Sequence, residues 1–353
     1  MWRPRIKVLS ALAVACIAAT AGAEASAAQG TAHAELPQKL SETGLFLPGS
    51  TRIAPDKLAY SPQYPLWSDG ATKRRWLHLP PGTSIDATNP DAWEFPVGTR
   101  LWKEFGYGRP VETRYIERLA DGSWQFGTYV WSVDGRDAEL APVEGIARLA
   151  VQDAPGGTYP IPSRDDCLGC HDAAAVPVLG VSALQLSPDR DRLAPHAESP
   201  QAESVNVQVL HERGLLRNLP LRLLEKPPRI AASSPGARAA LGYLHGNCGH
   251  CHNDDGPLAA LDLALLQPAA ASEDGPARTL ATLRGYASEF RLPGIDTRVV
   301  PGAHASSMLL ARMRSRNPLV QMPPLGTRVS DAAANALIER WIGHDLQTEE
   351  EEK

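Results

Sequence analysis

The chain has 353 residues, of which 43% are hydrophobic and 21% charged, enough for two or more domains with buried cores. This composition excludes a disordered or collagen-like chain, and 29 glycines and 31 prolines predict many turns rather than long helical bundles. The formal net charge of -5 and the lack of a Lys/Arg stripe argue against a nucleic-acid-binding protein, which normally presents a basic face.

The N-terminus is typical of an export signal. A basic start at residues 2–7 precedes an apolar run from Val8 to Ala19, and Ala25-Ser26-Ala27 is a small-residue cleavage site. We expect residues 1–27 to be a signal peptide, removed after Ala27, and the mature protein to be soluble and periplasmic. Cys16 leaves a lipid anchor as an alternative, although the residues before it form a poor lipobox. The apolar run is too short to span a membrane, and we expect no integral membrane segment later in the chain.

Residues 36–150 are predicted to form an antiparallel β domain, arranged as a sandwich. The segments 111–119 and 123–133 flank Asp121-Gly122, a strong signal for a hairpin turn. The aromatic residues before Gly127 stand at even positions and those after it at odd positions, so they would lie on opposite faces of a regular strand. This predicts a β-bulge at Gly127. We expect the aromatic side chains to form core, with a ligand groove as the alternative. Six of the eight tryptophans fall in this region: Trp67, Trp76, Trp93, Trp102, Trp124 and Trp131.

One loop of the β region, from Tyr60 to Gly70, combines aromatic, proline and acidic residues. Its Trp67 and Asp69, together with Lys73, are candidates for a docking surface, because aromatic and charged side chains are common where partners bind. The same stretch shows neither a metal-ligand cluster nor a nucleophile triad.

Cysteine spacing is the most specific signal in the chain. Apart from Cys16, the cysteines form two C-x-x-C-H motifs, at residues 167–171 and 248–252. This is the attachment sequence for c-type haem, in which two thiols add to the vinyl groups and the next histidine binds the iron. The sequence therefore predicts two covalently attached haem c groups. The predicted attachment set comprises the thiols of Cys167, Cys170, Cys248 and Cys251 and the proximal imidazoles of His171 and His252.

Three other roles for these cysteines fit the sequence less well. A zinc ribbon separates its two C-x-x-C pairs by roughly 15–20 residues, whereas residues 171–247 lie between the pairs here. A pair of disulfides suits an exported protein but explains neither of the histidines that follow. A thioredoxin-like dithiol site needs a βαβ setting and only one motif.

The second motif lies between two predicted helices. The first helix covers residues 235–244, with a serine cap and a proline at its start, and the other covers residues 330–342. Met322-Pro323-Pro324 precedes the second helix. Over residues 235–346 this arrangement resembles the class I c-type cytochromes. The resemblance implies that the sulfur of Met322 is the distal ligand opposite His252, and such His/Met ligation suits electron transfer rather than oxygen binding.

The distal ligand of the first haem has several candidates. His245 stands at the end of the helix before the second motif and could face a neighbouring haem, although it could equally cap that helix or bind a propionate. Another histidine, or Met308 or Met313 from a predicted amphipathic helix at residues 306–315, would also serve. The remaining alternative is an open or weakly occupied iron.

The combined pattern also resembles a group of exported bacterial dihaem proteins that join a β-rich N-terminal region to c-type haem motifs. This resemblance spans most of the mature chain and implies a haem-carrying redox protein without indicating a substrate. Besides the first motif, it depends on residues 66–70, 95–99, 161–163, 179–186, 243–248 and 322–324.

We therefore expect an α+β protein whose β domain is followed by mainly helical haem-binding parts. Residues 151–234 would hold the first haem and a connector, residues 235–346 a cytochrome c-like domain, and residues 347–353 an acidic tail. The favoured function is a periplasmic electron carrier between a dehydrogenase and an acceptor. The alternatives are a peroxidase-like or other haem enzyme with an open first haem, and a haem-bearing binding module.

Charge indicates the kind of partner. Removal of residues 1–27 leaves 32 basic and 39 acidic residues, and haem propionates would add more negative charge. We expect a redox protein partner with a basic docking face, because complementary charge steers association.

Overall fold

The computed structural model describes residues 35–198, 203–269 and 274–347. The described residues from Leu36 onward pack as one unit. The predicted signal peptide lies outside the described residues, and so does the predicted acidic tail apart from its first residue.

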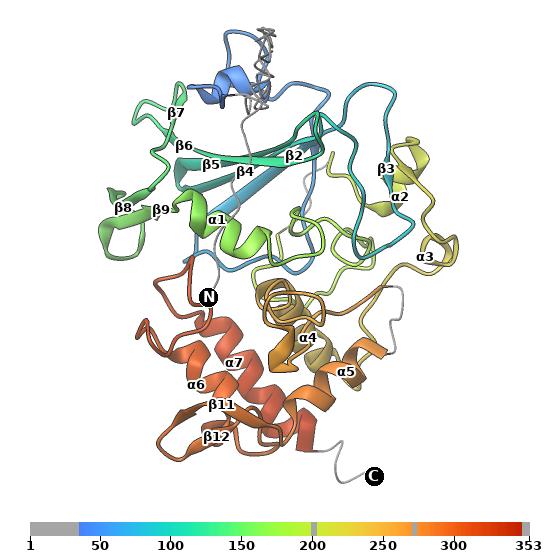
Figure 1. The fold of residues 1–353 in the computed structure, drawn as a ribbon, viewed down its shortest axis with the longest axis vertical. Coiled ribbons are helices and arrows are strands. Elements are labelled where there is room, and N and C mark those ends of the chain that lie inside the picture. The colour runs from blue at the N-terminus through green and yellow to red at the C-terminus, as the bar shows by residue number, and fades with distance from the viewer. Residues whose placement is uncertain (1–34, 199–202, 270–273, 348–353) are drawn as a thin grey trace, which may run out of the picture. The chain divides into compact units, whose positions relative to one another are not determined.

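A six-stranded antiparallel sheet is formed by the N-terminal part of this unit (Figure 1). Helices dominate the later part, which confirms the α+β class with an N-terminal antiparallel sheet. In spatial order the strands are β1 (Leu58–Ala59), β2 (Thr72–His78), β4 (Arg100–Tyr107), β5 (Arg109–Arg118), β6 (Trp124–Trp131) and β7 (Ala138–Leu140).

The predicted hairpin joins β5 to β6. Gly122 adopts a φ of 84° in the turn, a conformation that favours glycine, and its N–H donates to the Leu119 carbonyl. The predicted bulge at Gly127 is wrong, because Gly127 pairs with Tyr115 in an unbroken register. Aromatic residues occupy both parities of β6 because both of its faces are buried. A Cβ at Gly127 would lie only 3.0 Å from Leu36, so this glycine makes room for the N-terminal segment.

Different segments cover the two faces of the sheet. The segment around η1 (Leu40–Thr43) packs on one face and buries Trp76, Trp102 and Trp131. Helix α1 (Arg164–His171) lies against the opposite face and contacts β6. These tryptophans are therefore core, as expected. A second facing sheet, which a sandwich requires, does not occur among the described residues, since the sheet is covered by loop and helix instead.

The remaining strands form short two-stranded pairs. They are β3 (Ile85–Asp86) with β10 (Leu216–Arg217), β8 (Ile146–Ala150) with β9 (Thr158–Ile161), and β11 (Ala287–Leu292) with β12 (Ile295–Thr297). The other helices are α2 (Val207–Glu212), α3 (Arg222–Glu225), α4 (Pro235–Asn247), α5 (Asp274–Leu283), α6 (Met308–Arg314) and α7 (Ala332–Arg340). The single turns are η2 (Pro155–Gly157), η3 (Ala259–Leu261), η4 (His304–Ser306) and η5 (Trp341–Asp345). No helix in the described ranges combines the length and hydropathy needed to cross a bilayer.

The predicted helix pair around the second motif is confirmed. Helix α4 begins at Pro235 and is capped by Ser234, whose Oγ accepts the N–H of Ala237 at 2.9 Å. Asp331 caps α7 in the same way, accepting the N–H of Ala334 at 3.1 Å. The two helices contact each other, and their apolar faces belong to one core. Helix α6 also lies where the sequence predicts an amphipathic helix.

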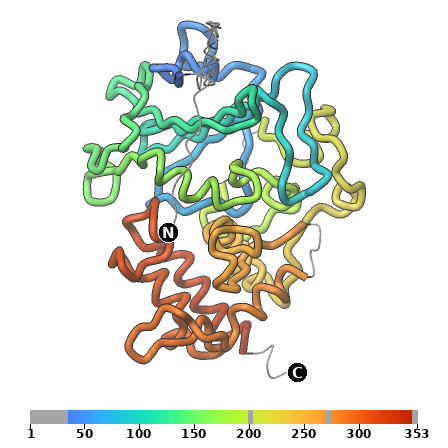
Figure 2. Tube along the Cα trace, viewed as in Figure 1, coloured from blue at the N-terminus to red at the C-terminus, as the bar shows by residue number. Residues whose placement is uncertain are grey.

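The loop from Tyr60 to Gly70 links the sheet to the helical part. Figure 2 shows this segment, in blue, between the sheet and the orange and red helical region. Tyr64 packs against α4 where Gly242 and Gly246 leave space: a Cβ at Gly242 would overlap the Tyr64 ring, and one at Gly246 would lie 2.4 Å from its carbonyl oxygen. These two glycines, one helical turn apart, therefore allow the loop to lie directly on α4.

Candidate functional site

The first cysteine motif forms the last turns of α1. Ser163 caps this helix: its Oγ accepts the N–H of Asp166 at 3.0 Å, and the Asp166 carboxylate accepts the N–H of Ser163 at 2.9 Å. Residues three and four apart share a helix face, so Cys167, Cys170 and His171 point to the same side. The helix thereby places the whole motif over the inner face of the sheet.

These three side chains line a cavity of about 620 Å³ between α1, the sheet and the Tyr60–Gly70 loop. The ring of His171 lies 5.1 Å from that of Phe126 on β6, measured between centroids. Its Nδ1 is 2.8 Å from the Pro177 carbonyl oxygen, so Nδ1–H donates and Nε2 keeps a free lone pair. Burial lowers the pKa of His171 to about 4, which leaves the imidazole neutral at pH 7.

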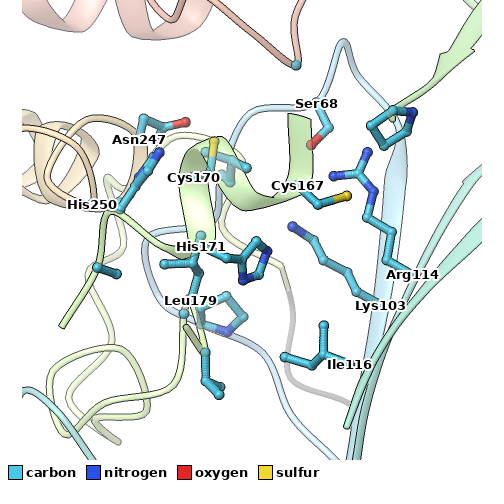
Figure 3. A pocket seen from close by; sticks show the side chains of 18 of the residues that line it. Ser68, Lys103, Arg114, Ile116, Cys167, Cys170, His171, Leu179, Asn247 and His250 are labelled. Atoms are coloured by element: carbon cyan, nitrogen blue, oxygen red, sulfur yellow. The ribbon is translucent and has the colours of Figure 1, made fainter. Parts of the chain in front are cut away.

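Three cationic residues of the sheet line the same cavity, namely Arg75 on β2, Lys103 and Arg114, and Figure 3 labels the last two. Arg114 on β5 binds the buried carboxylate of Glu112 at 2.7 Å, and Tyr159 donates its hydroxyl to that carboxylate at 2.8 Å. Lys103 on β4 directs its amine toward the ring of His171. No motif in the sequence marks Lys103 as a site residue; the available signal is that it shares strand parity with buried Leu101 and Phe105.

The second motif follows the end of α4. The N–H of Cys248 donates to the Leu244 carbonyl at 2.9 Å, and the N–H of His252 donates to the Cys248 carbonyl at 2.9 Å, so the chain continues to turn through the motif. Cys248, Cys251 and His252 line a second cavity of about 460 Å³. Burial raises the pKa of Cys248 to about 12 and lowers that of His252 to about 4.

Met322 lines this second cavity together with His252. The Met322 N–H donates to the carbonyl of Arg312 on α6 at 3.0 Å, and Arg312 Nε donates to the Val320 carbonyl at 2.8 Å, which ties the Met322 loop to that helix. Met308 and Met313 also border the second cavity. No methionine of the described ranges borders the first cavity, so the two cavities differ in the ligands they offer.

The two cavities meet at their cysteines. The side chains of Cys170 and Cys251 interact, which lowers the pKa of Cys170 and raises that of Cys251. All four motif cysteines are free thiols. Both cavities share a wall made of Trp67, Cys170, Asn247, His250, Pro323, Pro324 and Leu325.

His245 borders the first cavity, as the sequence analysis anticipated for a candidate ligand. Its Nδ1 accepts the backbone N–H of Gln267 at 3.1 Å. Burial lowers the pKa of His245 to about 4, so the ring is neutral and its single proton resides on Nε2. A nitrogen that carries a proton cannot bind iron, and this hydrogen bond therefore makes His245 a weak candidate ligand.

Side chains of the Tyr60–Gly70 loop, and Lys73 after it, make hydrogen bonds inside the protein. Trp67 Nε1 donates to the Val329 carbonyl at 3.0 Å. The buried carboxylate of Asp69 accepts the N–H groups of Arg328 (2.9 Å) and Val329 (3.0 Å), which follow the Met322 loop. Lys73 Nζ donates to the Leu66 carbonyl at 2.8 Å. This loop thus borders both cavities and supports the segment that carries Met322.

The residues present fit a covalently attached haem in each cavity. Thioether attachment needs two thiols and a neutral histidine beside a largely apolar cavity, and each motif supplies this set. The Nδ1 of His252 is buried without a hydrogen-bond partner in the described part of the chain. The cysteine pairs face two cavities, whereas a shared zinc site would need all four thiols to converge.

Comparison of the chain with protein-family models, with curated proteins and with solved structures finds no match.

Proposed function

We propose that the protein is an exported dihaem c-type cytochrome that carries electrons between a periplasmic dehydrogenase and an acceptor. In this proposal Cys167 and Cys170 attach one haem, with His171 as proximal ligand. The second motif attaches the other haem between His252 and Met322. The class I cytochrome c interpretation of residues 235–346 is supported by the α4–α7 contact and by Met322 in the cavity of His252.

The contact between Cys170 and Cys251 is the observation that carries this function. A thioether at each of these sulfurs would bring the edges of two macrocycles together. Electron transfer needs redox centres that lie close together, and the shared wall of the two cavities supports this arrangement. A protein with two haems serving separate purposes would not need this adjacency.

The chain's own residues favour a carrier at the second site. A haem supplies one-electron redox chemistry, and the protein sets its potential through the axial ligands and the surrounding dielectric. A soft thioether favours ferrous iron and fills the position where oxygen or peroxide would bind. Leu263 and Leu265 in the cavity wall further keep the site apolar.

The deciding experiment is the mass and absorption spectrum of protein matured in a host that attaches haem c. We expect two haems per chain and low-spin spectra that hydrogen peroxide leaves unchanged. Rapid reaction with peroxide would contradict the electron-carrier function and favour the peroxidase-like function. Colourless protein with the bare polypeptide mass would refute both. A colourless protein with a Cys170–Cys251 disulfide would show instead that the thiol contact is a disulfide site.

A further inference from the structure

The amine of Lys103 occupies a special position in the first cavity. It extends from the middle of β4, and Figure 3 shows it directed toward the ring of His171 and the thiol of Cys167. Its nearest aromatic contact is Phe105, whose ring centroid lies 4.8 Å from Nζ. Within the described residues Lys103 makes no hydrogen bond and no ion pair. An amine that faces a cavity without a partner points to a ligand inside that cavity.

The neighbouring cations differ from Lys103 because their charges are compensated. Arg75 on β2 binds Glu198 at 2.5 Å, and Arg114 binds Glu112 at 2.7 Å. Each carboxylate is also held by a hydroxyl, Ser61 for Glu198 and Tyr159 for Glu112. Both arginines therefore have carboxylate partners, whereas Lys103 has none among the described residues.

Other nitrogen and sulfur ligands for the first haem are less available. His245 carries its proton on Nε2, because Nδ1 accepts a backbone hydrogen bond. His250 interacts with the thiol of Cys170 and belongs to the second motif. Met308 and Met313 border the second cavity instead.

We infer that Lys103 is the distal axial ligand of the haem attached at Cys167 and Cys170, opposite His171. The inference deepens the proposed function and depends on it, because it assumes a haem in the first cavity. An amine binds iron through its lone pair and therefore only in its neutral form. Burial and the guanidinium of Arg75 hold the pKa of Lys103 well below its usual value, which favours that form. Both haems then have two protein ligands, as a carrier requires.

Two substitutions separate ligation from a purely electrostatic role. Lys103→Ala removes the amine. Lys103→Arg keeps a positive charge that could bind a haem propionate, but a guanidinium is always protonated and cannot bind iron. Lys57→Ala is the matched control, because Lys57 pairs with Asp56 at 2.6 Å and does not border either cavity.

The readouts are the haem content, the electron paramagnetic resonance spectrum of the oxidised protein and carbon monoxide binding to the reduced protein. We expect wild type and Lys57→Ala to be wholly low-spin. Both Lys103 variants should keep two haems and the far-red sulfur band of Met322, while half of the haem becomes high-spin and binds carbon monoxide. This pattern assigns the change to the first haem.

Three results would overturn the inference. The wild type could already contain one high-spin haem, which would mean that the first iron is open. Lys103→Arg could remain wholly low-spin, which would identify Lys103 as a charge partner. Lys103→Ala could also remain low-spin with two haems, which would require another ligand. In each case the protein still carries haem, so failure of this inference is distinct from a colourless protein, which refutes the proposed function itself.

Discussion

The side chain of Cys251 interacts with that of Cys170, although the two cysteines belong to different motifs in separate segments. One sulfur comes from a helix under the sheet, and the other follows the end of α4. The contact requires the sheet and the helical part to meet at this point. The packing of these two parts therefore sets how close haems attached at Cys170 and Cys251 would lie.

Two haems in contact should couple their strongest electronic transitions. We expect the circular dichroism of the two-haem protein to show a bisignate Soret signal. Replacing both cysteines of one motif by serine should halve the haem content and abolish the bisignate shape. A wild-type spectrum equal to the sum of the two single-haem variants would contradict contact between the sites.

Met322→Ala should remove the weak far-red sulfur-to-iron absorption of the oxidised protein, because no other ligand supplies that transition. The reduction potential of the second haem should fall by on the order of 0.1 V or more, since thioether ligation raises it and axial ligands tune haem potentials over roughly 0.8 V. Met308→Leu is the control, because Met308 is buried beside the same cavity and is not the expected ligand. A far-red band that persists in Met322→Ala and disappears in Met308→Leu would reverse the assignment.

Asp69→Ala should destabilise the protein by about 1–3 kcal/mol, because the amides of Arg328 and Val329 lose their buried acceptor. The Met322 band should also disappear at a lower temperature than in wild type. Asp69→Asn is the control: it keeps an acceptor oxygen, and asparagine tolerates the φ of 52° at this position. Urea unfolding measures the difference. Equal stability of the alanine and asparagine variants would show that these bonds contribute nothing.

Lys73 should make stability rise with pH in the alkaline range. Burial, reinforced by the charge of Arg75, lowers the pKa of Lys73 to about 8, below its ordinary value of 10.5. Between these pH values the unfolded chain binds more protons than the folded one, so unfolding becomes less favourable as pH increases. The effect is on the order of 2 kcal/mol from pH 8 to 10.

The measurement is the free energy of unfolding of wild type and Lys73→Met over this pH range. The variant should show a rise smaller by about this amount, because methionine has no titrating group, while the depressed pKa of Lys103 contributes to the rise in both proteins. Lys57→Met, which removes a lysine paired with Asp56, should retain it. Parallel pH profiles for wild type and Lys73→Met would contradict the argument.

Electron exchange should be faster with basic than with acidic redox donors of similar potential. Residues 28–353 contain 32 basic and 39 acidic residues, and haem propionates would increase this imbalance. Added salt screens charges, so the rate with a basic donor should decline as ionic strength rises. Stopped-flow rates at several salt concentrations test this, and a flat response would count against a basic partner.

Local signals were sufficient for several elements of this fold. The Asp121-Gly122 turn with its flanking segments predicts the β5–β6 hairpin, and the Ser234 cap followed by Pro235 predicts the start of α4. These predictions succeed because turn geometry and capping involve residues within a few positions of one another. The bulge expected at Gly127 failed because strand parity alone does not show that both faces of β6 are covered.

The sequence by itself determined which reactive groups are present: two C-x-x-C-H motifs and the Met322-Pro323-Pro324 segment. Only the tertiary structure brought Cys170 to Cys251, placed the Tyr60–Gly70 loop between the cavities and turned Lys103 toward His171. The reason is physical. Such contacts join residues far apart in the chain, and they form only when buried faces pack, as Tyr64 does against Gly242. Spacing along a chain specifies which groups are available, and packing decides which of them meet.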